Sequence, residues 1–116
     1  MANEFKSNVG GKVSKKEAME WIEKYDKEMR KDKSKDTKSI FYGRDLLLRI
    51  LSEDGSAGIT FFLALKYHEA VKKETIHLVL VPTREDGTFI WPADATARGG
   101  DSAAAFDFGS LCPPYC

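Results

Sequence analysis

Apolar residues recur at helical spacing in the first quarter of the chain and predict an amphipathic helix. Ser14 followed three residues later by Glu17 has the pattern of a capping box, so we expect the helix to begin there. Behind this start, Ala18, Ile22 and Met29 lie on one side, and Lys and Glu side chains fill the other. The pattern therefore predicts one apolar and one charged face.

The next apolar run covers residues 40–51 and follows a polar connection from Lys31 to Lys38. Leu47, Leu48 and Leu51 share a helical face, with Leu46 and Ile50 on its flank, which favours a second helix over the whole run. A strand at residues 40–42 followed by a shorter helix is the alternative. Either way, a segment this apolar is expected to be largely covered by other parts of the chain.

Strand patterns follow. Residues 58–67 alternate with a period of two, so that one face of this strand is strongly apolar. That face carries Ile59, Phe61, Leu63, Leu65 and Tyr67. Residues 75–81 are apolar on both faces, which is typical of the middle of a sheet. After a turn at Glu85-Asp86-Gly87, residues 88–91 predict a short third strand that Pro92 stops.

These elements predict an α+β fold. Because short connections favour antiparallel pairing, we expect a three-stranded antiparallel meander with the two N-terminal helices packed on one face and an irregular C-terminal tail. Residues 1–12 are predicted to be a flexible arm, residues 13–92 a single α+β domain, and residues 93–116 a tether of small residues with a tail. Phe62 and Val79 are apolar on what would be the second face, which favours a dimer or another protein partner there.

The overall composition narrows the class of protein. The 116 residues are 42% hydrophobic and 11% aromatic, which is typical of one folded domain. The 18 basic and 18 acidic side chains cancel, so the chain lacks the excess positive charge expected for binding nucleic acid or an anionic membrane. No secretory signal and no apolar run long enough to span a bilayer is recognisable. We therefore expect a cytoplasmic location with reduced thiols.

Both cysteines lie in the last five residues, Cys112-Pro113-Pro114-Tyr115-Cys116. An extended polyproline conformation would separate the two cysteines by about 12 Å, so we expect no disulfide unless the segment makes a tight turn or contains a cis prolyl bond. A stiff Pro-Pro-Tyr segment has the low ordering cost of a recognition element. Its predicted roles are binding a partner protein and covering the open face of this domain.

A thiol or zinc protein is the competing prediction. The four potential zinc ligands are Cys112, Cys116, His68 and His77. Four is the number that a closed zinc site requires, although the separation of nine positions from His68 to His77 does not match the spacing of a zinc finger. No pattern of catalytic residues and no cofactor motif is recognisable, so we predict neither catalytic residues nor a cofactor.

Several short motifs resemble one group of small bacterial proteins. Spread over residues 40–116, they are Phe41-Tyr42-Gly43-Arg44-Asp45-Leu46, Ile50-Leu51 with Gly55, Gly58-Ile59, Leu78-Val79-Leu80-Val81 and the terminal Cys112-Pro113-Pro114-Tyr115-Cys116. The group shares a Gly-Arg-Asp helix start and a closing Cys-Pro-Pro-x-Cys. The resemblance implies that the tail is a genuine feature, and it implies no activity.

The expected function is accordingly that of a non-catalytic protein-interaction module. It would act as a homodimer or with a protein partner, through the sheet face and the tail.

Overall fold

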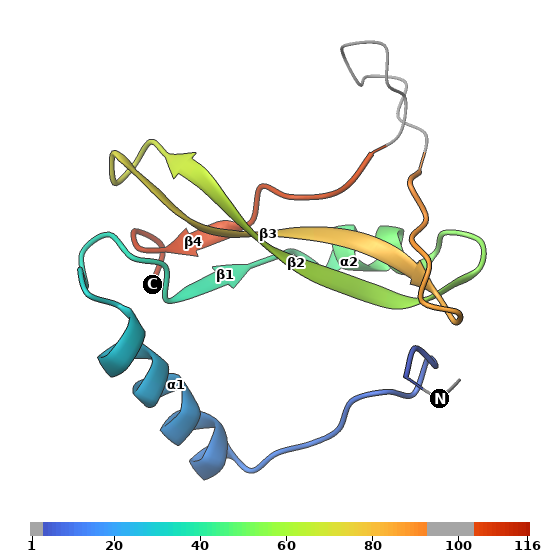
Figure 1. Cartoon of the computed structure of the whole chain (residues 1–116), viewed down its shortest axis with the longest axis horizontal. Coiled ribbons are helices and arrows are strands. Elements are labelled where there is room, and N and C mark those ends of the chain that lie inside the picture. The colour runs from blue at the N-terminus through green and yellow to red at the C-terminus, as the bar shows by residue number, and fades with distance from the viewer. Residues whose placement is uncertain (1–3, 93–103) are drawn as a thin grey trace. The chain divides into compact units, whose positions relative to one another are not determined.

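The computed structural model describes residues 4–92 and 104–116 (Figure 1). Residues 1–3 of the predicted arm and residues 93–103 of the predicted tether lie outside the described part. The helices and strands are α1 (Lys15–Met29), β1 (Ser39–Phe41), α2 (Arg44–Leu51), β2 (Ser56–His68), β3 (Lys73–Arg84) and β4 (Ser110–Cys112). The chain divides into two compact units, and the long β2–β3 hairpin contributes residues to each.

The first unit consists of Met1–Val9, Tyr42–Leu63 and Leu78–Gly109. Its core is formed by Ile50, Leu80 and Phe106, with Ile59 and Leu46 among the partly buried side chains that pack against them. Helix α2 packs in this core through Leu46, Leu47 and Ile50. Leu48 and Leu51, which the pattern places on one face with Leu47, are exposed, so the expectation that this face is covered is wrong. Phe106 is held against β3 by two backbone hydrogen bonds with Leu80, of 2.8 and 3.0 Å.

The second unit consists of Gly10–Phe41, Ala64–His77 and Ser110–Cys116. Here the tail returns to the chain as β4, which pairs antiparallel with β1 and places Ile40 opposite Leu111 (Figure 1). The backbone N–H of Lys38 also donates to the Cys112 carbonyl at 2.7 Å. The tail is therefore not wholly irregular, because Ser110–Cys112 is a strand.

The α+β class with two helices and antiparallel strands is confirmed, but the predicted three-stranded meander is wrong. The four strands form two separate two-stranded sheets, β1–β4 and β2–β3. Residues 88–91 make only one isolated bridge, between Phe89 and Thr83. The turn before them is formed as expected, with Gly87 at a φ of 87°. Residues 88–91 are too few to form a third strand beside β3 before the buried Pro92, which has no N–H to donate.

Residues 40–51 follow the alternative interpretation rather than the favoured one. The run divides at Gly43, which is extended and precedes the first turn of α2, so a short strand leads into a helix of eight residues. Leu47 N–H donates to the Gly43 carbonyl at 3.2 Å and closes that first turn. A continuous helix would have prevented Ser39–Phe41 from pairing with β4.

Helix α1 begins as predicted. The Ser14 hydroxyl accepts a hydrogen bond from the Glu17 backbone N–H at 3.1 Å, which satisfies one of the free donors of the first turn. The structure differs from the expectation of a packed helix, because no residue of α1 is buried. The apolar face that carries Ile22 and Met29 is exposed.

Candidate interaction surface

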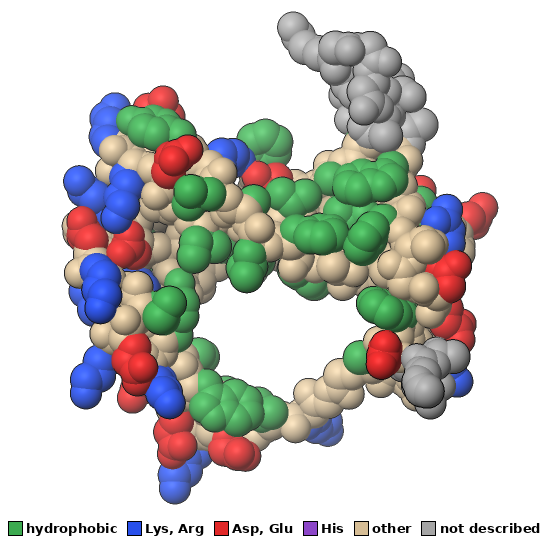
Figure 2. Space-filling model, viewed as in Figure 1, with side chains coloured by type: hydrophobic (Ala, Val, Ile, Leu, Met, Phe, Trp, Pro, Cys, Tyr) green, Lys and Arg blue, Asp and Glu red, His purple; other side chains and the backbone are tan. Residues whose placement is uncertain are grey.

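The most apolar face of β2 is exposed along most of its length. Side chains alternate between the two faces of a strand, so four alternate residues form one line, which we call the β2 row. Its members and their exposed fractions are Phe61 (50%), Leu63 (79%), Leu65 (67%) and Tyr67 (49%). On the neighbouring strand, Leu80 is fully buried at 0%. Figure 2 shows that many hydrophobic side chains, drawn in green, lie at the molecular surface.

The edge of β2 is open as well. In residues 4–92 and 104–116, β3 is the only strand that pairs with β2. β3 also makes isolated bridges with Phe106 and Phe89, although the sheet that it forms with β2 has two strands. An unpaired edge presents a row of backbone N–H and C=O groups to any other extended chain. Within the described part of the chain, the 13-residue β2 thus combines an apolar face with an edge that no second strand pairs with.

Phe62 and Val79, the two residues predicted for a second interaction face, have different surroundings in the first unit. Phe62 is exposed and its ring centroid lies 5.1 Å from that of Phe89, which is in turn 6.4 Å from Trp91. Val79 is half-buried and lines a hollow with Leu46 and other side chains near Phe106. The structure therefore leaves Phe62 in an exposed aromatic cluster.

The tail differs from the extended segment that the sequence predicted. Cys112 and Cys116 are joined by a disulfide, with their Cα atoms 4.7 Å apart, and both prolyl bonds between them are cis. The expectation of an outstretched pentapeptide is therefore wrong. Cys112 is buried beside β1, whereas Cys116 and Tyr115 are exposed. The Tyr115 N–H donates to the Leu111 carbonyl at 2.8 Å and closes the loop against β4.

The alternative zinc ligands are not brought together as a set. The rings of His68 and His77 contact each other edge to face, 5.7 Å between centroids, and His77 is buried near the Thr75 hydroxyl. Both cysteine sulfurs are used in the disulfide. In the described part of the chain, no group of three or more His, Cys, Asp or Glu side chains is placed to hold a metal ion. The histidines are therefore best described as a packed pair at the end of the hairpin.

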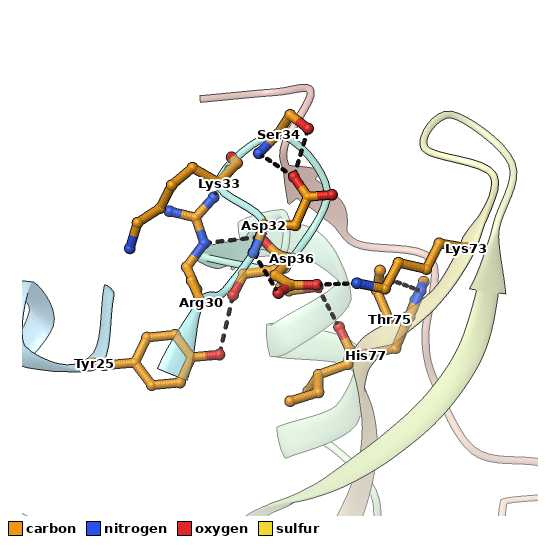
Figure 3. A network of polar contacts seen from close by, with 11 residues as sticks. Tyr25, Arg30, Asp32, Lys33, Ser34, Asp36, Lys73, Thr75 and His77 are labelled. Atoms are coloured by element: carbon orange, nitrogen blue, oxygen red, sulfur yellow. Dashed lines mark hydrogen bonds and ion pairs between the residues drawn. The ribbon is translucent and has the colours of Figure 1, made fainter. Parts of the chain in front are cut away.

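The loop between α1 and β1, expected to be only a solvated connection, is built around a buried guanidinium (Figure 3). Arg30 forms an ion pair with Asp26 and donates to the carbonyl oxygens of Lys33 and Asp36, each at 2.8 Å. Sequence reasoning missed this role because Arg30 lies in a run of charges that is typical of solvent-exposed surface.

The same loop is attached to the hairpin by Asp36. Its carboxylate accepts from the Lys73 ammonium at 2.7 Å and from the Asp32 backbone N–H at 3.0 Å. The hydrogen bond from Lys73, and then that from the Asp32 N–H, hold the pKa of Asp36 below its ordinary value. The Thr37 hydroxyl adds a bond to the Ile76 carbonyl at 2.8 Å. These contacts hold the loop in one conformation and provide no obvious reactive group.

One tyrosine in the first unit is chemically perturbed. The Tyr42 hydroxyl lies 2.8 Å from the Leu78 carbonyl and 3.2 Å from an Asp107 carboxylate oxygen. Burial, together with the nearby negative charge of Asp107, raises the pKa of Tyr42 to about 12. A phenol with this pKa stays protonated at neutral pH. Its hydroxyl therefore donates a hydrogen bond that links the residues just before α2 to β3.

Comparison with protein-family models, with curated proteins and with solved structures finds no significant match to this chain. Within the described residues, neither helix has the length and apolar character needed to cross a membrane.

Proposed function

We propose that this protein is a non-catalytic interaction module that binds another protein chain through the β2 row. The observation that carries the proposal is the exposure of Phe61, Leu63, Leu65 and Tyr67 on one face of one strand. Contiguous apolar surface with an open strand edge is characteristic of protein-binding sites. The balance of acidic and basic side chains favours a protein partner over nucleic acid or a membrane.

We propose the tail as a separate, second contact site. Tyr115 is exposed on the loop that the disulfide closes, and tyrosine is a frequent contact residue because it combines an apolar ring with a hydroxyl. A closed loop loses little conformational entropy on binding.

The proposal is tested by hydroxyl-radical footprinting in two settings. The protein is labelled as purified material at low concentration and at its native level in an extract of the cells that produce it. Protection of Leu63 and Tyr67 in the extract is the expected result, and a Leu63→Lys variant should lose the protection at Tyr67. Equal labelling of wild-type protein in both settings, at every concentration, would refute the proposal.

Thiol–disulfide exchange at Cys112–Cys116 is the second candidate, favoured by the exposure of Cys116 next to the buried Cys112. A thiolate from a partner would attack the Cys116 sulfur, form a mixed disulfide and release the Cys112 thiolate. Disulfides are typical of oxidising compartments, so the predicted cytoplasmic location is tested by the same measurement. Mass spectrometry of freshly isolated protein should show a mass lower than the reduced chain by two hydrogen atoms. A fully reduced chain that forms no mixed disulfide with glutathione disulfide would exclude this candidate.

A further inference from the structure

A hollow in the first unit is large enough to hold a small molecule. Its volume is about 460 Å³, and it is lined by residues of α2, of β3 and of the segment around Phe106. Sites for small ligands commonly measure ~300–1,000 Å³ and combine apolar walls with a few polar groups that orient the ligand. Every residue that lines this hollow belongs to the first unit, so the hollow is contained in one compact part of the chain.

We propose that this hollow binds a small monocarboxylate with an apolar body, and that Arg49 holds the carboxylate group. The site is separate from the β2 row, because none of the four residues of the β2 row lines the hollow.

The apolar body of such a ligand would contact Leu46, Val79 and Phe106. The first two side chains are half-buried, and Phe106 is 8% exposed in the core. Phe106 is also fixed by its two backbone hydrogen bonds with Leu80. Because these side chains are already held by the fold, little conformational entropy is lost when a ligand contacts them.

Arg49 provides the positive charge of the hollow. Its Cζ atom lies 5.3 Å from the centroid of the Phe106 ring, a cation–π contact that positions the guanidinium beside the apolar wall. The side chain is exposed, and no ion pair of Arg49 is formed within residues 4–92 and 104–116. A guanidinium over an aromatic ring can still donate two parallel hydrogen bonds to one carboxylate. The charge of Arg49 is therefore complementary to a carboxylate at this wall.

Asp107 restricts the ligand to a single carboxylate. It also lines the hollow, and one of its carboxylate oxygens lies 3.2 Å from the Tyr42 hydroxyl. A second negative charge on the ligand would be repelled by this carboxylate. An organic acid with one carboxylate and an otherwise apolar structure therefore fits the hollow better than a dicarboxylate.

Phe108 adds an exposed ring and an unusual backbone conformation to the same hollow. Its side chain is 92% exposed and its φ is 68°, in the left-handed region that a bulky residue seldom adopts. Backbone conformations of this kind occur preferentially at ligand-binding and other functional sites. A bound apolar body would cover part of this ring.

The site is tested by NMR titration of the full chain with phenylacetate and with octanoate, which present a flat ring and a flexible chain on the same carboxylate. At least one of the two acids should shift the amide signals of Arg49, Ala105 and Phe106 and leave those of the second unit unchanged. The neutral analogue phenylacetamide should bind at least tenfold more weakly than phenylacetate, because it lacks the charge that Arg49 recognises. The dicarboxylate homophthalate should also bind more weakly than phenylacetate.

Variants separate the charge from the cavity. Arg49→Gln should weaken carboxylate binding at least tenfold, the effect of losing hydrogen bonds between charged groups. The matched control is Arg44→Gln, on the same helix, because Arg44 is exposed and does not line the hollow; it should bind like wild type. Ala105→Trp keeps Arg49 but fills the hollow from an exposed position, and it should abolish binding of both acids.

Three results would overturn the proposal. They are the absence of amide shifts at the hollow with both acids up to millimolar concentrations, equal affinity of phenylacetate and phenylacetamide, and equal carboxylate affinity of wild type and Arg49→Gln. Each is read from wild type or from variants at exposed arginines, and unchanged amide signals away from the hollow show that a variant is folded. None of these results bears on the β2 row, which is tested separately by footprinting.

Discussion

Truncation of one buried and one exposed leucine in the same hairpin is the sharpest test of the fold. Leu80 is fully buried in the core of the first unit, whereas Leu63 in the same unit is 79% exposed. Leu80→Ala loses about 2.4 kcal/mol of transfer free energy at ~0.8 kcal/mol for each buried carbon removed. The cavity left behind brings the expected loss to roughly 2–5 kcal/mol of unfolding free energy. For Leu63→Ala, with about a fifth of the side chain buried, we expect a loss of about 0.5 kcal/mol.

The assay is urea denaturation followed by circular dichroism, with wild type and both variants at the same low protein concentration. Thermal melting is a second measurement: at about 4 °C per kcal/mol, Leu80→Ala should lower the midpoint by roughly 10 °C or more. Equal losses for the two variants at low concentration would refute the assignment of Leu80 to the core and Leu63 to the surface.

Three further predictions concern polar contacts. Because Lys73 stabilises the ionised Asp36, this contribution to stability is present at neutral pH and is lost as the pH falls through the lowered pKa of Asp36. NMR titration should show the Asp36 pKa rising toward its ordinary value in Lys73→Gln. Tyr42, with a pKa of about 12, should contribute stability below pH ~10 that is lost as the pH rises toward 12. Asp107→Asn should lower the Tyr42 pKa in a spectrophotometric titration, and an unchanged value would exclude Asp107 as a cause. Ser14→Ala should cost about 0.5–2 kcal/mol in chemical denaturation, whereas Ser14→Asp should retain the cap; equal stability of all three proteins would contradict the capping role.

Local patterns in the sequence were sufficient to predict several elements of the fold. The hydroxyl of Ser14 caps the helix that begins beside it, and the turn before Gly87 forms where Asp86 and Gly87 predict one. The long β2 and β3 strands also follow their apolar patterns closely. The cap and the turn depend on side chains acting on backbone groups a few residues away, and the strand pattern is an alternation between neighbouring residues, so the local sequence indicates all of them.

Contacts between segments far apart in the chain could not be predicted from these local patterns. The division of residues 40–51 at Gly43 depends on β1 finding β4, about seventy residues later in the chain. The disulfide depends on how the two residues between Cys112 and Tyr115 turn the chain, which the local sequence leaves open. The role of Arg30 depends on the loop folding back so that the carbonyl oxygens of Lys33 and Asp36 reach its guanidinium.

The sequence by itself determined that β2 has an apolar face, because alternation in a strand is a local property. Only the tertiary structure decided what covers that face. Ile59 packs against Leu80 and Phe106 in the core, while Leu63 and Leu65 on the same face lie exposed. Burial depends on where distant segments come to lie, and a periodic pattern specifies which residues share a face but not which other part of the chain, or which second chain, will cover it.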